Sequence, residues 1–180
     1  MKRCIALFIA ILLLLPFLPT TSSQDNLVET IIKLVNKKTI EYYLSNLLSF
    51  APRYTGSENC KRAEEWAYLE FLKMGLHAEF FEWEMNGFSD RNVIATLPGK
   101  SNYTIILSAH IDTVEKAPGA DDDGSGVAAV LAAAKALRYF HFSSTIKFVL
   151  FSGEEVGTYG SYNYARYLYE KGEKIIAVFM

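Results

Sequence analysis

Two short segments of the 180-residue sequence concentrate side chains of the kind that bind metal ions. Residues 108–126 (SAHIDTVEKAPGADDDGSG) contain His110, Asp112 and three consecutive aspartates, and residues 152–157 (SGEEVG) contain two adjacent glutamates. An imidazole and several carboxylates gathered in one place suit a divalent cation such as zinc. The sequence therefore indicates metal-dependent chemistry.

His110 and Asp112 are spaced as a metal-binding histidine and its support would be. A histidine that binds a metal through one ring nitrogen usually has the other nitrogen held by a carboxylate or a carbonyl oxygen. Residues i and i+2 of an extended segment face the same side, so Asp112 is placed to orient His110. The alternative is a histidine at the end of a strand beside a solvated aspartate.

Asp121, Asp122 and Asp123 precede a run of small apolar residues that predicts a helix. Aspartates are favoured at helix N-termini, where they cap backbone N–H groups and interact with the helix dipole, so one of the three is expected to do this. Three adjacent like charges repel one another, however, and a cation would relieve the repulsion. One carboxylate has two oxygens, so a single aspartate could bridge two metal ions.

Glu154 and Glu155 are adjacent, so their side chains are expected to point in different directions. This allows one to bind metal and the other to take a proton from metal-bound water, which ionises near neutral pH. A solvated loop is the simpler interpretation of an isolated Glu-Glu pair. The preceding buried strand and the first cluster of potential ligands favour the metal site.

The elements around these segments predict a doubly wound α/β domain. Residues 103–109 (YTIILSA) and 145–151 (TIKFVLF) have the nearly continuous apolar pattern of central strands. Open α/β sheets bind ligands just beyond the carboxyl ends of such strands, which is where both clusters lie. Helical spacing or strand patterns predict the other elements: helices over 25–35, 39–48 (with Thr39 as a possible cap), 61–74, 125–137 and 160–171, and strands over 76–83, 92–97 and 174–180.

The N-terminus has the pattern of a secretory signal peptide over residues 1–23. Lys2 and Arg3 precede a short apolar run, which is followed by small polar residues. An uncleaved membrane anchor is the alternative. We therefore expect a secreted or extracytoplasmic protein, with membrane association only if the signal is retained, and residues 24–180 as part of one domain.

Composition excludes some other functions. The net charge of −2 and the lack of a basic stripe argue against nucleic-acid binding. Without the signal, Cys60 is the only cysteine, which leaves no intrachain disulfide and no cysteine-based metal site. The oligomeric state does not follow from the sequence.

Three motifs in this order and spacing, SAHIDTV, PGADDDGSG and SGEEVG, resemble the co-catalytic zinc aminopeptidases. That family includes bacterial leucyl aminopeptidase and aminopeptidase Y, with glutamate carboxypeptidase as a relative. The resemblance extends over about residues 44–180. It implies a three-layer α/β/α fold with a mixed, largely parallel central sheet, two zinc ions in a complete site, and peptide substrates cleaved at the N-terminal residue.

The resemblance also implies a role for each candidate residue. His110 would bind one zinc ion, Asp121 would bridge both, and Glu155 would bind the second. Glu154 would be the general base and Asp112 would hold His110. A cis peptide bond is expected after the bridging aspartate, between Asp121 and Asp122.

The sequence departs from the family pattern at its C-terminal end. The family takes two further ligands downstream, an aspartate just past the next strand and a later histidine. By spacing, that aspartate would fall about two residues beyond Met180. We therefore expect the N-terminal part of a metallopeptidase, which alone would bind zinc weakly and hydrolyse little.

Three functions stay open: an aminopeptidase, a related carboxypeptidase or glutaminyl cyclase, and a non-catalytic binding protein with the same fold. The residues that would distinguish the first two are expected mostly downstream of this chain.

Overall fold

The structure, a computed structural model, describes residues 23–180 in two compact units, which divide after Lys33. Helix α2 (Ser23–Leu34) belongs to the first unit except for its last residue, and its bounds are close to those predicted, residues 25–35. The predicted signal peptide lies outside the described residues apart from Ser23. In the part of the chain that is described, no helix has the length and apolar character needed to cross a membrane.

Two helices open the second unit. Helix α3 (Lys37–Leu48) is capped by Asn36, whose side chain accepts from the Thr39 N–H, so the prediction that Thr39 is the cap was wrong. Helix α4 (Glu58–Lys73) begins earlier than predicted because Ser57 caps it by accepting from the Cys60 N–H. It gives way to Gly75, as predicted, and a φ of +77° there suits glycine.

The five strands of the second unit form one mixed sheet in the order β1-β2-β4-β3-β5. Strands β1 and β2 and strands β2 and β4 pair antiparallel, whereas β3 pairs parallel with both β4 and β5. The strand bounds are β1 His77–Met85, β2 Phe88–Leu97, β3 Tyr103–His110, β4 Thr145–Phe151 and β5 Lys174–Phe179.

The first hairpin is longer than the sequence patterns predicted. Asn86 and Gly87 both have positive φ and form a two-residue turn that leaves Met85 opposite Phe88. Turns of this kind match the twist of the flanking strands, so pairing continues up to the turn.

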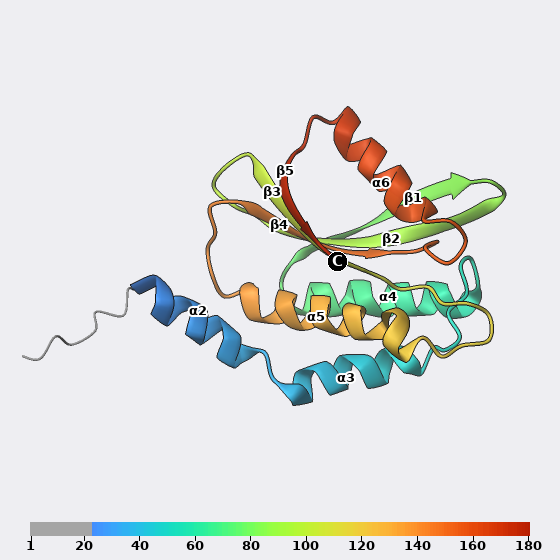
Figure 1. Ribbon diagram of the computed structural model, residues 1–180, viewed down its shortest axis with the longest axis horizontal. Helices are drawn as coiled ribbons and strands as arrows, with labels where there is room; N and C mark the ends of the chain where they lie inside the picture. Colours follow the sequence, from blue (N-terminus) through green and yellow to red (C-terminus); the bar gives the residue numbers. More distant parts are fainter. Residues whose placement is uncertain (1–22) are drawn as a thin grey trace, which may run out of the picture. The chain divides into compact units, whose positions relative to one another are not determined.

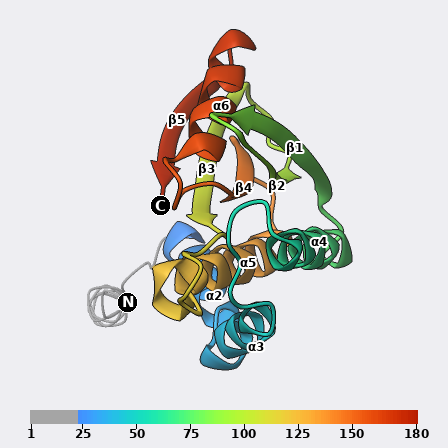
Figure 2. The same ribbon diagram turned by 90° about the vertical axis from the view of Figure 1, so that its right-hand side faces the viewer.

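Helices cover both faces of the sheet, which confirms the three-layer α/β/α prediction (Figures 1 and 2). Helix α4 and helix α5 (Gly126–Leu137) pack on one face, and α3 packs on the outer side of α5. Helix α6 (Tyr159–Glu170) packs on the opposite face, against β1 and β2.

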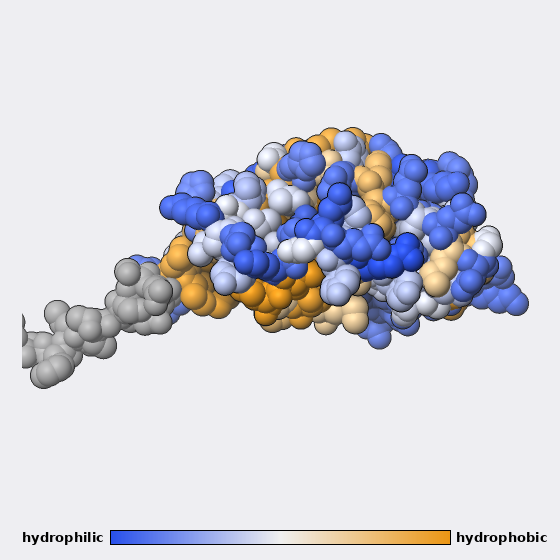
Figure 3. Space-filling model, turned by 90° about the horizontal axis from the view of Figure 1, so that it is seen from above, coloured by the Kyte–Doolittle hydropathy of each residue, from blue (hydrophilic) through white to orange (hydrophobic). Residues whose placement is uncertain are grey.

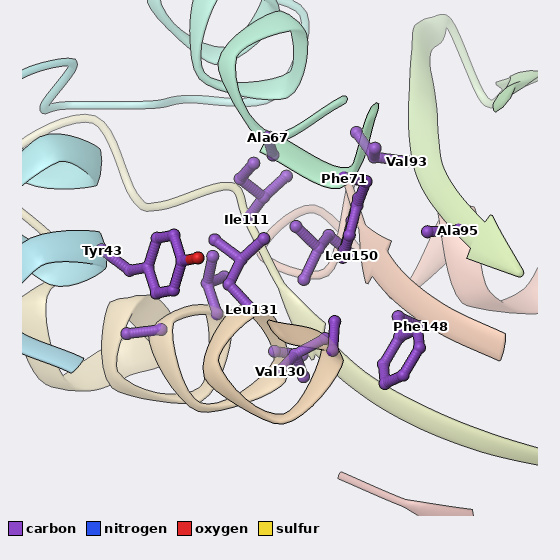
Figure 4. Packing of buried hydrophobic residues seen from close by; sticks show 14 of the residues in the cluster. Tyr43, Ala67, Phe71, Val93, Ala95, Ile111, Val130, Leu131, Phe148 and Leu150 are labelled. Carbon is purple, nitrogen blue, oxygen red and sulfur yellow. The ribbon is translucent and has the colours of Figure 1, made fainter. Parts of the chain in front are cut away.

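The larger core lies between the sheet and helices α4 and α5 (Figure 4). Phe71 of α4 stacks on Phe148 of β4 with ring centroids 6.2 Å apart. Leu131 of α5 and Ile111, just beyond β3, are fully buried in the same cluster. The burial of Ile111 fixes the chain directly between His110 and Asp112.

Strand β5 pairs with β3 and exposes Ile176, Val178 and Phe179, and Met180 directly after the strand is exposed as well. Apolar surface lies among hydrophilic residues on the side of the molecule shown in Figure 3.

Candidate metal centre

The two predicted clusters meet because strands β3 and β4 are parallel neighbours. His110, the last residue of β3, lies opposite Phe151, the last residue of β4. The Ile111 N–H donates to the Phe151 carbonyl at 2.7 Å, which extends the pairing one step past both strands. Segments 110–112 and 152–155 therefore leave the sheet side by side, at its carboxyl edge as predicted.

The two ring nitrogens of His110 face different groups. Nδ1 lies 3.2 Å from the Asp112 backbone oxygen and 3.7 Å from Asp112 Oδ1. Nε2 lies 2.9 Å from Asp122 Oδ1 and 4.0 Å from Glu154 Oε2. Asp112 thus lies on the supporting side of the ring, and Nε2 faces the carboxylates.

Asp112 is fully buried and serves as an anchor for the second segment. Its two carboxylate oxygens accept the backbone N–H groups of Glu154 (3.2 Å) and Glu155 (3.1 Å). Thr55 Oγ1 donates to Asp112 Oδ2 at 2.8 Å. One carboxylate therefore sets the position of both adjacent glutamates relative to His110.

His110, Glu154 and Glu155 each present a potential ligand atom, and these atoms all lie within 4.8 Å of one another. All three residues are partly exposed. A nitrogen and two carboxylates at this spacing are a donor set that fits a divalent metal such as zinc. The group contains residues from both predicted clusters.

The three aspartates differ in what they contact. Asp122 reaches His110, as described above. Asp123 Oδ1 accepts the Gly126 N–H at the start of α5, and its Oδ2 accepts the His110 N–H, so Asp123 is the expected capping aspartate. Asp121 is exposed, and its backbone oxygen accepts from Ser125. The structure thus brings Asp122, rather than Asp121, to the imidazole.

The expected cis peptide bond between Asp121 and Asp122 was placed one residue too early. The structure has a cis bond between Asp122 and Asp123. The sequence pattern of three identical residues carries no feature that distinguishes these two positions.

The carboxylates control the charge of the imidazole. Burial alone would lower the pKa of His110, but Asp112, Asp122 and Asp123 outweigh it and raise the pKa to about 9. Burial acts against the charged form of Asp112, yet its hydrogen bonds with His110, Thr55 and the two glutamate N–H groups hold its pKa below the usual range. Burial and the neighbouring Asp122 carboxylate raise the pKa of Glu155. This excess of negative charge is what a cation would neutralise.

Buried polar contacts hold the segment that carries the two glutamates. The Ser152 N–H donates to Asn92 Oδ1, and Ser152 Oγ accepts from Trp83 Nε1 at 2.9 Å. Gly153 has a φ of +76°, and a Cβ there would lie 2.4 Å from the Trp83 ring. The chain can turn from β4 toward Asp112 only because this residue is glycine.

Sequence reasoning missed two residues of the loop between α3 and α4. Thr55 binds Asp112, and the side chain of Arg53 is completely buried beneath the loop that follows Asp112. The segment was predicted only as a loop rich in turn residues. The sequence linked this loop to the site only because the loop lies within the region that resembles the aminopeptidases.

Comparison with known proteins shows similarity to peptidases. The family model "Peptidase family M28" matches residues 92–180. A "Probable leucine aminopeptidase" of Trichophyton verrucosum is 32% identical over 177 residues, which cover 89% of this chain and 47% of the relative. The chain spans about half the length of the curated relatives it matches.

Solved structures share the fold. LapB from Legionella pneumophila superposes with a TM-score of 0.78 at 25% identity, over 89% of this chain and 46% of that one. A glutaminyl cyclase from Porphyromonas gingivalis gives a TM-score of 0.74 at 26% identity, over 81% of this chain and 58% of that one. Together with the family match, these similarities show that residues 92–180 carry a peptidase family M28 domain.

Proposed function

We propose that the protein is an exported zinc-dependent aminopeptidase, in which the cluster around His110 is the catalytic metal centre. The observation that carries the proposal is the convergence of His110, Glu154 and Glu155 at the carboxyl ends of two parallel strands. The family match and the relatives named leucine aminopeptidase support the same reaction. Export rests on the signal-like N-terminal sequence.

In this proposal His110 Nε2 and Glu155 hold metal, and Asp122 takes the bridging position first expected for Asp121. Asp122 Oδ1 lies 2.9 Å from His110 Nε2, which places its carboxylate beside the proposed ligand atom. Asp112 keeps the imidazole oriented from the other side, through its backbone oxygen and its nearby carboxylate. When bound, zinc would polarise the peptide carbonyl and lower the pKa of a water molecule.

Glu154 is the general base of the proposed reaction. Its side chain is partly exposed, and Oε2 lies 4.0 Å from His110 Nε2, on the side of the ring that faces the carboxylates. A carboxylate in this position accepts a proton from the attacking water and returns it to the leaving amine. Asp112 fixes the main chain of Glu154, so the backbone position from which the Glu154 side chain extends is defined.

The test is Glu154→Gln in the complete natural polypeptide, with a leucine p-nitroanilide substrate. Turnover should fall by about 10²–10⁴-fold, because general acid–base catalysis contributes that much, while bound zinc is retained. The exposed Glu170→Gln on α6 is the matched control and should leave turnover unchanged. Equal turnover in the Glu154 variant and the wild type would contradict the proposal, and a zinc-binding wild type without turnover would indicate the non-catalytic alternative.

The similarity to a glutaminyl cyclase favours one second candidate function. The same metal centre would then assist closure of an N-terminal glutamine with loss of ammonia. Mass spectrometry of a peptide with N-terminal glutamine distinguishes the two reactions, since an aminopeptidase removes the whole residue. Loss of ammonia alone would replace the aminopeptidase proposal with this one.

The location of the protein is tested separately. N-terminal sequencing of the protein recovered outside the cytoplasm of its native source should begin near residue 24. A protein that remains in the cytoplasm with an intact N-terminus would contradict export, without affecting the proposed chemistry.

A further inference from the structure

We propose that Arg53 is a positioning residue for the metal centre, because its guanidinium fixes the main chain between His110 and the aspartates. The inference rests on the proposed function, since it assigns the arginine to the same site. Arg53 lies in the loop between α3 and α4 and is fully buried. It does not touch the proposed ligands with its side chain.

The guanidinium binds three backbone carbonyls of the segment that connects the two parts of the site. Nε donates to the Ile111 oxygen at 2.7 Å, Nη1 to the Pro118 oxygen at 3.0 Å, and Nη2 to the Gly119 oxygen at 3.1 Å. Ile111 follows His110 directly, and Gly119 stands two residues before Asp121. One side chain therefore holds both ends of the loop.

Gly119 transmits this constraint to the aspartates. Its carbonyl oxygen accepts from Arg53 Nη2 and also from the Gly124 N–H at 3.1 Å. The turn closed by the second bond contains Asp121, Asp122 and Asp123. Fixing the Gly119 oxygen thus fixes the turn that places Asp122 against His110.

Arg53 is itself held in place through its main chain. Its N–H donates to Thr113 Oγ1 at 2.9 Å, and its carbonyl oxygen accepts the Thr113 N–H at 3.1 Å. Burial lowers the pKa of the Arg53 guanidinium, and nearby negative charge, that of Asp112 included, acts against this shift. The position demands an arginine, because only a planar fork of donors can reach three separate carbonyls from one stem.

The first test is the affinity of the complete polypeptide for Co²⁺, followed by visible absorption and by chelator competition. Arg53→Lys keeps the charge but loses the fork, and should weaken binding about 10–100-fold, as is typical when groups that support metal ligands are lost. Arg53→Ala should weaken binding at least as much, and millimolar guanidinium ion should restore it. Arg62→Lys, an exposed arginine of α4, is the control and should bind like the wild type.

A second readout needs no metal. In the metal-free protein, amide hydrogen exchange over residues 111–124 should rise in Arg53→Lys, while exchange in the strands stays at the wild-type level. A wild type that binds no metal would contradict the proposed function, whereas the exchange result would still decide the role of Arg53 in the loop.

Three results would overturn the positioning role. Arg53→Lys could bind Co²⁺ as the wild type does. The loss in Arg53→Ala could be unaffected by guanidinium ion. Either variant could unfold globally or show raised exchange throughout the molecule, which would assign Arg53 to general core stability.

Discussion

Thr55 Oγ1 donates a hydrogen bond to Asp112 Oδ2 at 2.8 Å, although 57 residues separate the two in the chain. Both side chains are buried. The same carboxylate accepts the N–H groups of Glu154 and Glu155, so Asp112 joins the loop before α4, the end of β3 and the segment after β4. The arrangement of the candidate site therefore depends on one buried carboxylate and on the groups that donate hydrogen bonds to it.

Thr55→Val should destabilise the protein by about 1–3 kcal/mol, because the substitution keeps the shape but leaves a buried carboxylate without one of its donors. Urea unfolding of the metal-free protein measures the change. Thr30→Val is the control, since Thr30 is exposed on α2 and its hydroxyl donates to the Asn26 oxygen one turn earlier in the same helix. Its effect should stay within about 0.5 kcal/mol. Equal stability of the Thr55 variant and the wild type would contradict the role assigned to this hydrogen bond.

A second buried carboxyl predicts how stability depends on pH. Glu64 lies beside Asp90 and Cys60 and pairs with Arg91, whose Nε is 2.9 Å from Oε2. Burial, followed by the charge of Asp90, raises the pKa of Glu64 to about 8, against an ordinary value of 4.5. Between these two values the folded protein holds a proton that the unfolded chain has released. The stabilisation is therefore complete below pH 4.5 and is lost as pH rises through 8.

Glu64→Gln should remove this part of the pH dependence, because the amide stays neutral at every pH. The free energy of unfolding should fall more steeply between pH 5 and pH 9 in the wild type than in the variant. Glu65→Gln, next in the chain and exposed, should keep the slope of the wild type. Parallel curves for the wild type and the Glu64 variant would show that Glu64 does not titrate in this range.

Much of this architecture could be predicted from the sequence. The apolar runs before His110 and Ser152 identified the central strands, and the position of both clusters after such strands predicted that they would meet. The Asn86-Gly87 pair is typical of a two-residue hairpin turn, but the predicted strands stopped at residue 83 and restarted at residue 92. Here the local sequence predicted the right elements, and the error lay in the length of the two strands.

The groups that hold the site could not be predicted in this way. Arg53 has no local feature that distinguishes a buried arginine from an exposed one, since its three acceptors are carbonyls more than 50 residues away. Asp121 and Asp122 are identical neighbours, and only the turn from Gly119 to Gly124 decides which one faces His110. Such information lies in the tertiary contacts and not in the pattern of residue types.

Gly119→Ala should destabilise the protein by about 2–5 kcal/mol. Gly119 has a φ of +61°, and a Cβ there would lie 2.1 Å from Thr113 Cγ2 and 2.9 Å from Arg53 Nη2. The cost combines a left-handed backbone with overpacking. Gly75→Ala is the matched control, because Gly75 has a φ of +77° with open space around it, and should cost only about 1–2 kcal/mol. Thermal and urea unfolding compare the two, and similar losses would argue against tight packing beneath the loop.

Matched substitutions of Asp122 and Asp121 show which of the two carboxylates binds metal. Asp122→Asn removes the charge that faces His110 Nε2 at 2.9 Å, so zinc affinity of the complete polypeptide should fall by at least about 10-fold. Both carboxylates are exposed, but Asp122 is the one that lies against His110 Nε2, so Asp121→Asn, the same chemical change one residue earlier, should leave affinity nearly unchanged. Competition with a chromogenic chelator measures both. The reverse order would restore Asp121 to the bridging position, because the two substitutions are chemically identical and differ only in their position.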